Sequence, residues 1–131
     1  MGMFGALDAA STGASLGRVW MDVIADNVAN VNTVRPAGEE PFRAAKVVAQ
    51  SQGGLSGVRV QNLVLTGGEP DVAYDPDNPL ADQQGYVTRP KVDLSEEMTN
   101  MLVANRMYGA NLAVMQQAKD SYQAALSIGR N

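Results

Sequence analysis

Cysteine and histidine are both absent from this chain of 131 residues. Without them the protein has no thiol nucleophile, no Cys/His zinc site and no imidazole general base. Its serines have no histidine that could activate them, and the sequence contains no Gly-x-Ser-x-Gly motif. We predict that the protein is not an enzyme and binds neither a cofactor nor a metal ion.

Acidic residues do gather in one place, at Asp75, Asp77 and Asp82. A calcium loop would also need a mid-loop glycine and a bidentate glutamate, and here Pro79 stands at a ligand position. We interpret these aspartates as turn formers that accept hydrogen bonds from their own backbone.

Basic residues and long apolar runs are scarce. Lys and Arg number 10 against 14 Asp and Glu, so no basic stripe is available for a phosphate backbone and nucleic acid is not an expected partner. No apolar run approaches the roughly 20 residues that span a bilayer, and we expect no membrane insertion. The first residues, Met1 to Trp20, lack the charged start and apolar stretch of a secretory signal. We expect a soluble chain, or one that leaves the cell without a cleaved signal.

Aromatic residues make up only 5% of the chain, and many of its hydrophobic residues are alanine. A core built from such small side chains is thin, and a small domain with a thin core is only marginally stable. We therefore expect the fold to gain stability from partners.

Helical periodicity, by contrast, is plentiful at both ends. From about Phe4 to Val31, apolar and small residues recur at alternating spacings of three and four, which predicts one long helix. Gly13 and Gly17 weaken an isolated helix by about 1 kcal/mol each, but they permit the close approach of a second helix. The stripe consists of Leu7, Ala10, Ala14, Gly17, Met21, Ile24, Val28 and Val31.

Three asparagines, Asn27, Asn30 and Asn32, mark the end of this first helix. Asparagine can cap a helix terminus and tolerates the left-handed backbone that stops one. Three within six residues exceed the need of one cap, so we predict a cap together with polar contacts to a neighbouring chain.

A second helix is predicted from about Leu94 to Ile128, with Ser95 as its N-cap and Gly129 at its end, beside Arg130. At 1.5 Å per residue it would be about 54 Å long, more than the rest of the chain could cover. Part of its stripe must therefore face something other than the rest of this chain. That stripe consists of Leu94, Met98, Met101, Asn105, Tyr108, Leu112, Met115, Lys119, Tyr122 and Leu126.

The residues between the helices are rich in strand and turn signals. We predict a mainly α fold with a small β-rich middle, in which the long helices of segments 1–33 and 94–131 pack as a coiled coil, with segment 34–93 as a β-hairpin and extended-loop insert between them in the chain. The expected extended pieces are a hairpin of Phe42–Gln50 and Leu55–Leu65, a strand Asp71–Tyr74, and a stretch Tyr86–Val92.

Two exposed stripes on one chain indicate a protein built for assembly. An alternative is a cytoplasmic coiled-coil adaptor or scaffold, which would use the same stripes but would not need a β-rich insert. The candidate assembly residues are Leu7, Ala14, Met21, Ile24, Asn27, Val28, Asn30, Asn32, Leu94, Met98, Met101, Asn105, Tyr108, Leu112, Met115, Tyr122 and Leu126.

Two motifs carry a family resemblance. The helix end Met21–Thr33 is similar to that of axial proteins of the bacterial flagellum. The downstream residues Tyr74-Asp75-Pro76, Gly85-Tyr86-Val87 and Ala104–Asn111 resemble the FlgC family of proximal rod proteins, with Asn78 and Leu80 as departures from the expected histidine and aspartate.

The resemblance implies a structural subunit of the flagellar basal-body rod, the drive shaft that transmits torque for motility. It implies export through the flagellar type III apparatus and assembly in the periplasm. The terminal helices would form the inner coiled-coil layer. Expected partners are copies of the chain, other rod proteins of the FlgB, FlgF, FlgG and FliE types, and the export apparatus.

Overall fold

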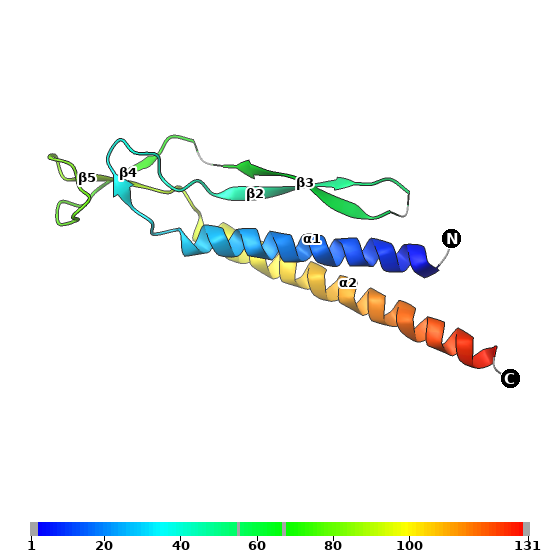
Figure 1. Cartoon of the computed structure of the whole chain (residues 1–131). Coiled ribbons are helices and arrows are strands. Elements are labelled where there is room, and N and C mark those ends of the chain that lie inside the picture. Colours follow the sequence, from blue (N-terminus) through cyan, green and yellow to red (C-terminus); the bar gives the residue numbers. More distant parts are fainter. Residues whose placement is uncertain (1–2, 55, 67, 130–131) are drawn as a thin grey trace.

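The computed structural model describes residues 3–54, 56–66 and 68–129 (Figure 1). Helix α1 (Met3–Ala29) and helix α2 (Leu94–Ile128) lie side by side, and the described strands come between them in the chain. The arrangement confirms the predicted mainly α fold with a small β-rich middle.

The two helices run antiparallel along one seam and diverge toward the chain termini (Figure 1). Residues further along α2 meet residues progressively earlier in α1, which fixes the direction. The successive pairs are Asn27 with Glu97, Gly17 with Tyr108, Gly13 with Asn111, and Phe4 with Tyr122.

The start of α2 differs from the sequence prediction in its capping residue. The Asp93 carboxylate accepts hydrogen bonds from the backbone N–H groups of Ser95 at 2.9 Å and Glu96 at 3.1 Å, so Asp93 is the N-cap and the prediction of Ser95 was wrong. Asp is as good a cap as Ser and adds a favourable charge at the helix N-terminus. Gly129 is the C-cap as predicted, whereas Arg130 lies outside the described residues.

The predicted hairpin is present as β2 (Ala45–Ser51) and β3 (Val58–Leu65), paired antiparallel with a bulge between Val48 and Ala49. It is shorter at both strand starts than predicted, and Leu55 lies outside the described residues. The hairpin contacts α1, with its tip on the side away from α2 and its base also beside the start of α2 (Figure 1). Along most of the hairpin, α1 is therefore the middle layer of the molecule.

A second sheet stands where α1 ends and α2 begins. Its strand order is β1 (Arg35–Pro36), β5 (Tyr86–Arg89) and β4 (Asp71–Tyr74), all antiparallel. The prediction of β4 was confirmed, and β5 ends three residues earlier than expected. The sequence analysis missed β1 because two residues carry no periodicity, and only pairing with β5 defines them as a strand.

The core is thin, as the composition predicted. Its buried hydrophobic residues in the described chain are Ala10, Ala14, Ile24, Ala44, Val87 and Ala104. Most are alanines that allow close packing but bury little area. Within residues 3–54, 56–66 and 68–129, none of the helices has both the length and the apolar character to cross a membrane.

Candidate assembly interface

Asn27 joins three elements at the centre of the molecule. Its Nδ2 donates to the Ala45 carbonyl at 2.9 Å and to Glu97 Oε1 at 3.0 Å, while its Oδ1 accepts from the Ala45 N–H at 2.9 Å. The side chain is 1% exposed and Glu97 is 5% exposed. A buried carboxylate needs a donor, so Asn27 locks α1 to both β2 and α2.

The other asparagines of this segment lie elsewhere. Asn30 closes the helix end locally: its Nδ2 donates to the Asp26 carbonyl at 2.9 Å, and Thr33 Oγ1 donates to its Oδ1 at 3.1 Å. Asn32 is exposed in the following turn. The three asparagines therefore have different surroundings, although the sequence analysis treated them as one group. Asn27 is buried and joins three elements, Asn30 caps the helix end, and Asn32 is exposed.

Gly13 and Gly17 lie where α1 meets α2, which confirms their predicted part in close helix packing. A Cβ at position 13 would lie 2.6 Å from Asn111 Oδ1, and a Cβ at position 17 would lie 3.2 Å from Tyr108 Cβ. A larger residue at position 17 would press on the Tyr108 backbone and push the helices apart, whereas one at position 13 would force the Asn111 amide to move.

The opposite side of α1 receives the hairpin tip. Thr12 Oγ1 donates to the Ala9 carbonyl at 2.8 Å and accepts from the Val58 N–H at 3.1 Å. Gly57 has a φ of +77°, and a Cβ there would collide with Thr12. The Thr12 hydroxyl therefore bonds the hairpin to α1, and Gly57 leaves room for this close contact.

The residues of α2 that face α1, which we call the seam, agree with the predicted stripe at some positions and lie one residue away from it at others. Met101, Tyr108 and Met115 belong to it and are partly buried, as the stripe predicted, and Tyr122 continues it by packing against Phe4. The other residues of the seam each come one position earlier in the chain than the predicted ones: they are Glu97, Ala104, Asn111 and Ala118. The residues predicted in their place are exposed: Met98, Asn105, Leu112 and Lys119.

The displaced half of the stripe leaves an exposed apolar surface on one side of α2. We call it flank A: Met98, Leu102, Asn105, Gly109 and Leu112. Met98 is 61% exposed, Leu102 64% and Leu112 42%. At about 100° per residue, these positions lie roughly 80° to 160° around the helix from Ala104.

A second exposed surface lies on the other side of the seam. We call it flank B: Val103, Ala110 and Val114. Val103 is 49% exposed and Val114 is 48% exposed. These positions lie roughly 80° to 120° from Ala104 in the opposite direction. Helix α2 therefore has one covered side and two uncovered apolar sides.

Helix α1 exposes a different surface. Apart from Phe4, which is 66% exposed, its outward residues are polar or small, among them Asp8, Ser11, Ser15, Arg18 and Asp22. A helix that is apolar on several sides is usually surrounded by protein, whereas a helix with a polar face can border water. Of the two helices, α2 therefore has more apolar surface without a partner, and the hairpin adds a smaller exposed group at Leu63, Val64 and Leu65.

The predicted assembly residues fall into two groups. Those that the structure leaves exposed are Asn32, Leu94, Met98, Asn105, Leu112, Tyr122 and Leu126. Those that are partly or fully buried are Leu7, Ala14, Met21, Ile24, Asn27, Val28, Asn30, Met101, Tyr108 and Met115. Leu102, Val103 and Val114 were missed, because they lie outside a two-position heptad stripe.

The loop formed by residues 75–85 folds on its own hydrogen bonds. Asp82 Oδ1 accepts from the N–H groups of Gln84 at 2.9 Å and Tyr86 at 2.8 Å, which confirms the turn-forming interpretation for this aspartate. The exposed rings of Tyr74 and Tyr86 pack edge to face at 5.3 Å. The loop therefore connects two exposed tyrosines that pair at the ends of β4 and β5.

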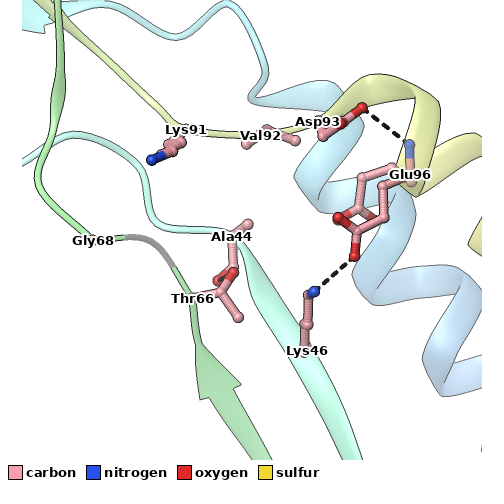
Figure 2. Close-up of a pocket in the computed structure, with 9 residues that line it drawn as sticks. Ala44, Lys46, Thr66, Gly68, Lys91, Val92, Asp93 and Glu96 are labelled. Carbon is pink, nitrogen blue, oxygen red and sulfur yellow. Dashed lines mark hydrogen bonds and ion pairs between the residues drawn. The ribbon is translucent and has the colours of Figure 1, made fainter.

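A hollow of about 310 Å³ lies between the base of the hairpin and the start of α2 (Figure 2). Lys46 Nζ lies 2.8 Å from Glu96 Oε1 across this hollow. The hydrogen bond to Glu96 and the carboxylate charge raise the pKa of Lys46 above its ordinary value. Two lysines and three carboxylates line the hollow, and the Lys46–Glu96 pair ties β2 to α2 there.

Two family models match this chain. Residues 7–36 match the model described as flagella basal body rod protein, and residues 83–128 match the C-terminal model of flagellar basal body rod FlgEFG proteins. The first covers most of α1 and the second covers β5 and α2.

Whole-length relatives agree with these models. The flagellar basal-body rod protein FlgC of Borreliella burgdorferi is 33% identical, covering 98% of this chain and 98% of the relative. FlgC of Yersinia enterocolitica is 34% identical and FlgC of Bacillus subtilis 31%, each covering 99% of this chain and 100% of the relative.

Proposed function

Since this chain belongs to the FlgC family of flagellar basal-body rod proteins and is a structural subunit of the rod, we propose that it assembles through the exposed flanks of α2. The partners are copies of itself and other rod proteins, of the FlgB, FlgF, FlgG and FliE types. The observation that carries this proposal is the uncovered apolar surface of α2 beside a polar outer face on α1.

The energetic reason is the cost of leaving these flanks in water. Burial of apolar surface contributes about 25 cal/mol per Å², and Met98, Leu102 and Leu112 are each left largely or partly uncovered. None of the residues that define flank A or flank B is charged, so burying these residues does not require the desolvation of a charged group. A neighbouring helix would recover this free energy at little desolvation cost.

The three segments then have separate parts in the rod. We propose that helices 1–33 and 94–131 form the inner coiled-coil layer and that segment 34–93 packs outside it, since the hairpin tip already lies on the side of α1 away from α2. Export through the flagellar type III apparatus precedes assembly in the periplasm, where the finished rod transmits torque. This assignment needs neither catalysis nor a cofactor.

A charge on flank A tests the proposal. Leu102→Asp and Leu112→Asp would each place a carboxylate in the helix contact, where an unpaired buried charge costs several kcal/mol. We expect swimming in soft agar to be lost and rods to be missing from isolated basal bodies, while the amount of soluble subunit is unchanged.

The matched control is Ala113→Asp, which puts the same carboxylate on the exposed side of α2 about 180° from Ala104. This variant should swim normally. Normal rods in both flank A variants would rule out flank A as the assembly surface, and loss of swimming in the control as well would show a general effect of charge on α2.

A further inference from the structure

The three-stranded sheet carries a second hollow, of about 440 Å³, which we call the acidic hollow. Thr88 of β5 lines it, and Val72, which pairs with Thr88 across the sheet, is 58% exposed there. Three exposed glutamates also line it: Glu39 and Glu40 follow β1, and Glu69 comes just before β4. The acidic hollow therefore combines an apolar surface with three negative charges.

Thr88 indicates that the acidic hollow takes a polar ligand. The residue is only 2% exposed. Its hydroxyl takes part in no hydrogen bond in the described part of the chain, although every fully enclosed side-chain nitrogen and oxygen there has a partner. The hydroxyl must therefore lie in the small open part of Thr88, which faces the hollow. It remains free to donate or to accept a hydrogen bond.

An arginine side chain suits this combination of groups. Its guanidinium has five N–H donors for carboxylates and a hydroxyl, and its aliphatic stem packs on apolar surface. The chain's own Arg35 is paired with Thr88 across the sheet but does not line the hollow. Within the described residues, Arg35 forms no ion pair with the three glutamates. Their charge is therefore available to a ligand from outside.

The hairpin carries the opposite charge. Residues 45–65 contain Lys46 and Arg59 and no acidic residue, whereas residues 66–85 contain five acidic residues and no basic one. Lys46 is already paired with Glu96 at the hairpin base. Arg59 is therefore the basic group that the hairpin can offer to a partner.

Arg59 lies near the hairpin tip, on the face that points away from α1. Its neighbours in β3, Val58 and Val60, are half-buried, whereas Arg59 is exposed. Its Nη2 donates to Gln50 Oε1 at 2.9 Å, which leaves its other donors free. The hairpin tip and the three-stranded sheet lie at opposite ends of the molecule (Figure 1). An arginine from the hairpin therefore reaches the acidic hollow only from another copy of the chain.

Resting on the rod assembly proposed above, we propose that Arg59 at the hairpin tip of one copy inserts into the acidic hollow of a second copy. The tip and the hollow are different surfaces, so the contact can repeat from copy to copy. Two hollows or two tips facing each other would bring like charges together. The contact lies within segment 34–93 and is separate from the flanks of α2.

Charge reversal tests the electrostatic basis of this contact. Arg59→Glu and Glu69→Lys each weaken the attraction, so we expect smaller swimming halos in soft agar and fewer rods. Combining the two substitutions restores opposite charges and should recover swimming. The matched controls are Arg18→Glu and Asp22→Lys on the exposed polar side of α1, which should swim normally. Normal swimming of both single variants, Arg59→Glu and Glu69→Lys, would overturn the inference.

Cross-linking identifies the occupant, and the absence of native cysteine makes every introduced thiol unique. Gln61→Cys lies two residues after Arg59 on the same face of β3, and Val72→Cys lines the acidic hollow. Basal bodies from swimming strains with either or both cysteines are treated with a short thiol cross-linker. We expect covalent dimers of this chain from the double-cysteine strain only.

The failure of this contact can be told apart from the failure of the rod proposal. Rods without dimers in the double-cysteine strain, or dimers from Val72→Cys alone, would overturn the placement of the hairpin tip in the hollow. Neither result bears on α2. Rods that form normally despite Leu102→Asp and Leu112→Asp would instead refute the wider proposal that flank A is an assembly surface.

Discussion

The Asn27 side chain shows how much of this fold rests on single polar residues. With a core made mostly of alanine, the molecule joins α1, β2 and α2 through one amide that both donates and accepts. Removing one partner of a buried hydrogen bond leaves the other group unsatisfied. This lowers the free energy of unfolding by about 1–3 kcal/mol, and by more when the remaining group is charged. At the residue scale, hydrogen bonds at the junction therefore matter more than buried area.

Asn27→Ala should lower the free energy of unfolding by about 2–4 kcal/mol, since Glu97 and the Ala45 backbone lose their partner together. The single tryptophan, Trp20, lines a hollow with Ala45 and Glu97 and reports on this junction by fluorescence during urea unfolding. Asn32→Ala, at an exposed position, is the control and should change little. Equal urea midpoints for Asn27→Ala and the unaltered protein would contradict the proposed stabilising role of the Asn27 hydrogen bonds.

Lys46 provides a contrast, because its pair with Glu96 is exposed. Exposed ion pairs contribute at most about 1 kcal/mol and are screened by salt. The pKa of Lys46 is raised in the folded protein, so its contribution is complete below the ordinary lysine pKa and is lost as pH rises through the folded value. Lys46→Gln should thus lower stability slightly at pH 8 in low salt and have no effect at high pH or in high salt. An undiminished effect in 1 M salt would contradict this.

The two long helices show, at the scale of elements, what periodicity can and cannot predict. The bounds of both helices and the stripe of α1 were predicted within a few residues, because regular spacing of apolar residues directly reports a helix. On α2 the same reasoning found Met101, Tyr108 and Met115 but placed the other half of the seam one residue late. Apolar residues surround much of α2, so periodicity alone could not show which of them face α1.

The helix glycines offer a test at this scale. Gly109 has open space around its missing side chain, so Gly109→Ala should stabilise the isolated subunit by up to about 1 kcal/mol through helix propensity. Gly13→Ala brings the same propensity but meets the Asn111 amide at 2.6–2.8 Å, so we expect no gain or a loss. Thermal unfolding followed by circular dichroism measures both. A similar gain from the two substitutions would contradict close packing at Gly13.

At the scale of the whole molecule, the exposed apolar residues of the two helices lie mostly on α2, and this could not have been predicted from the stripes alone. The hairpin, α1 and α2 form three layers, with polar residues on the exposed side of α1 and apolar flanks on α2. Family motifs identified a rod protein, but the position of the hairpin and the junction at Asn27 depend on contacts between residues far apart in sequence. The structure supplied those contacts, and they leave the apolar flanks of α2 exposed, which is why we propose α2 as the assembly surface.

Electron cryomicroscopy of isolated basal bodies, at a resolution that places side chains in the rod, tests the central claim most directly. We predict that α2 of this subunit lies between helices of two neighbouring subunits, which cover Leu102 and Leu112 on one side and Val103 and Val114 on the other. The face of α1 that bears Asp8, Ser15 and Asp22 should stay clear of those neighbouring α2 helices. A rod in which both flanks of α2 face solvent while that face of α1 makes the contacts between subunits would contradict the claim.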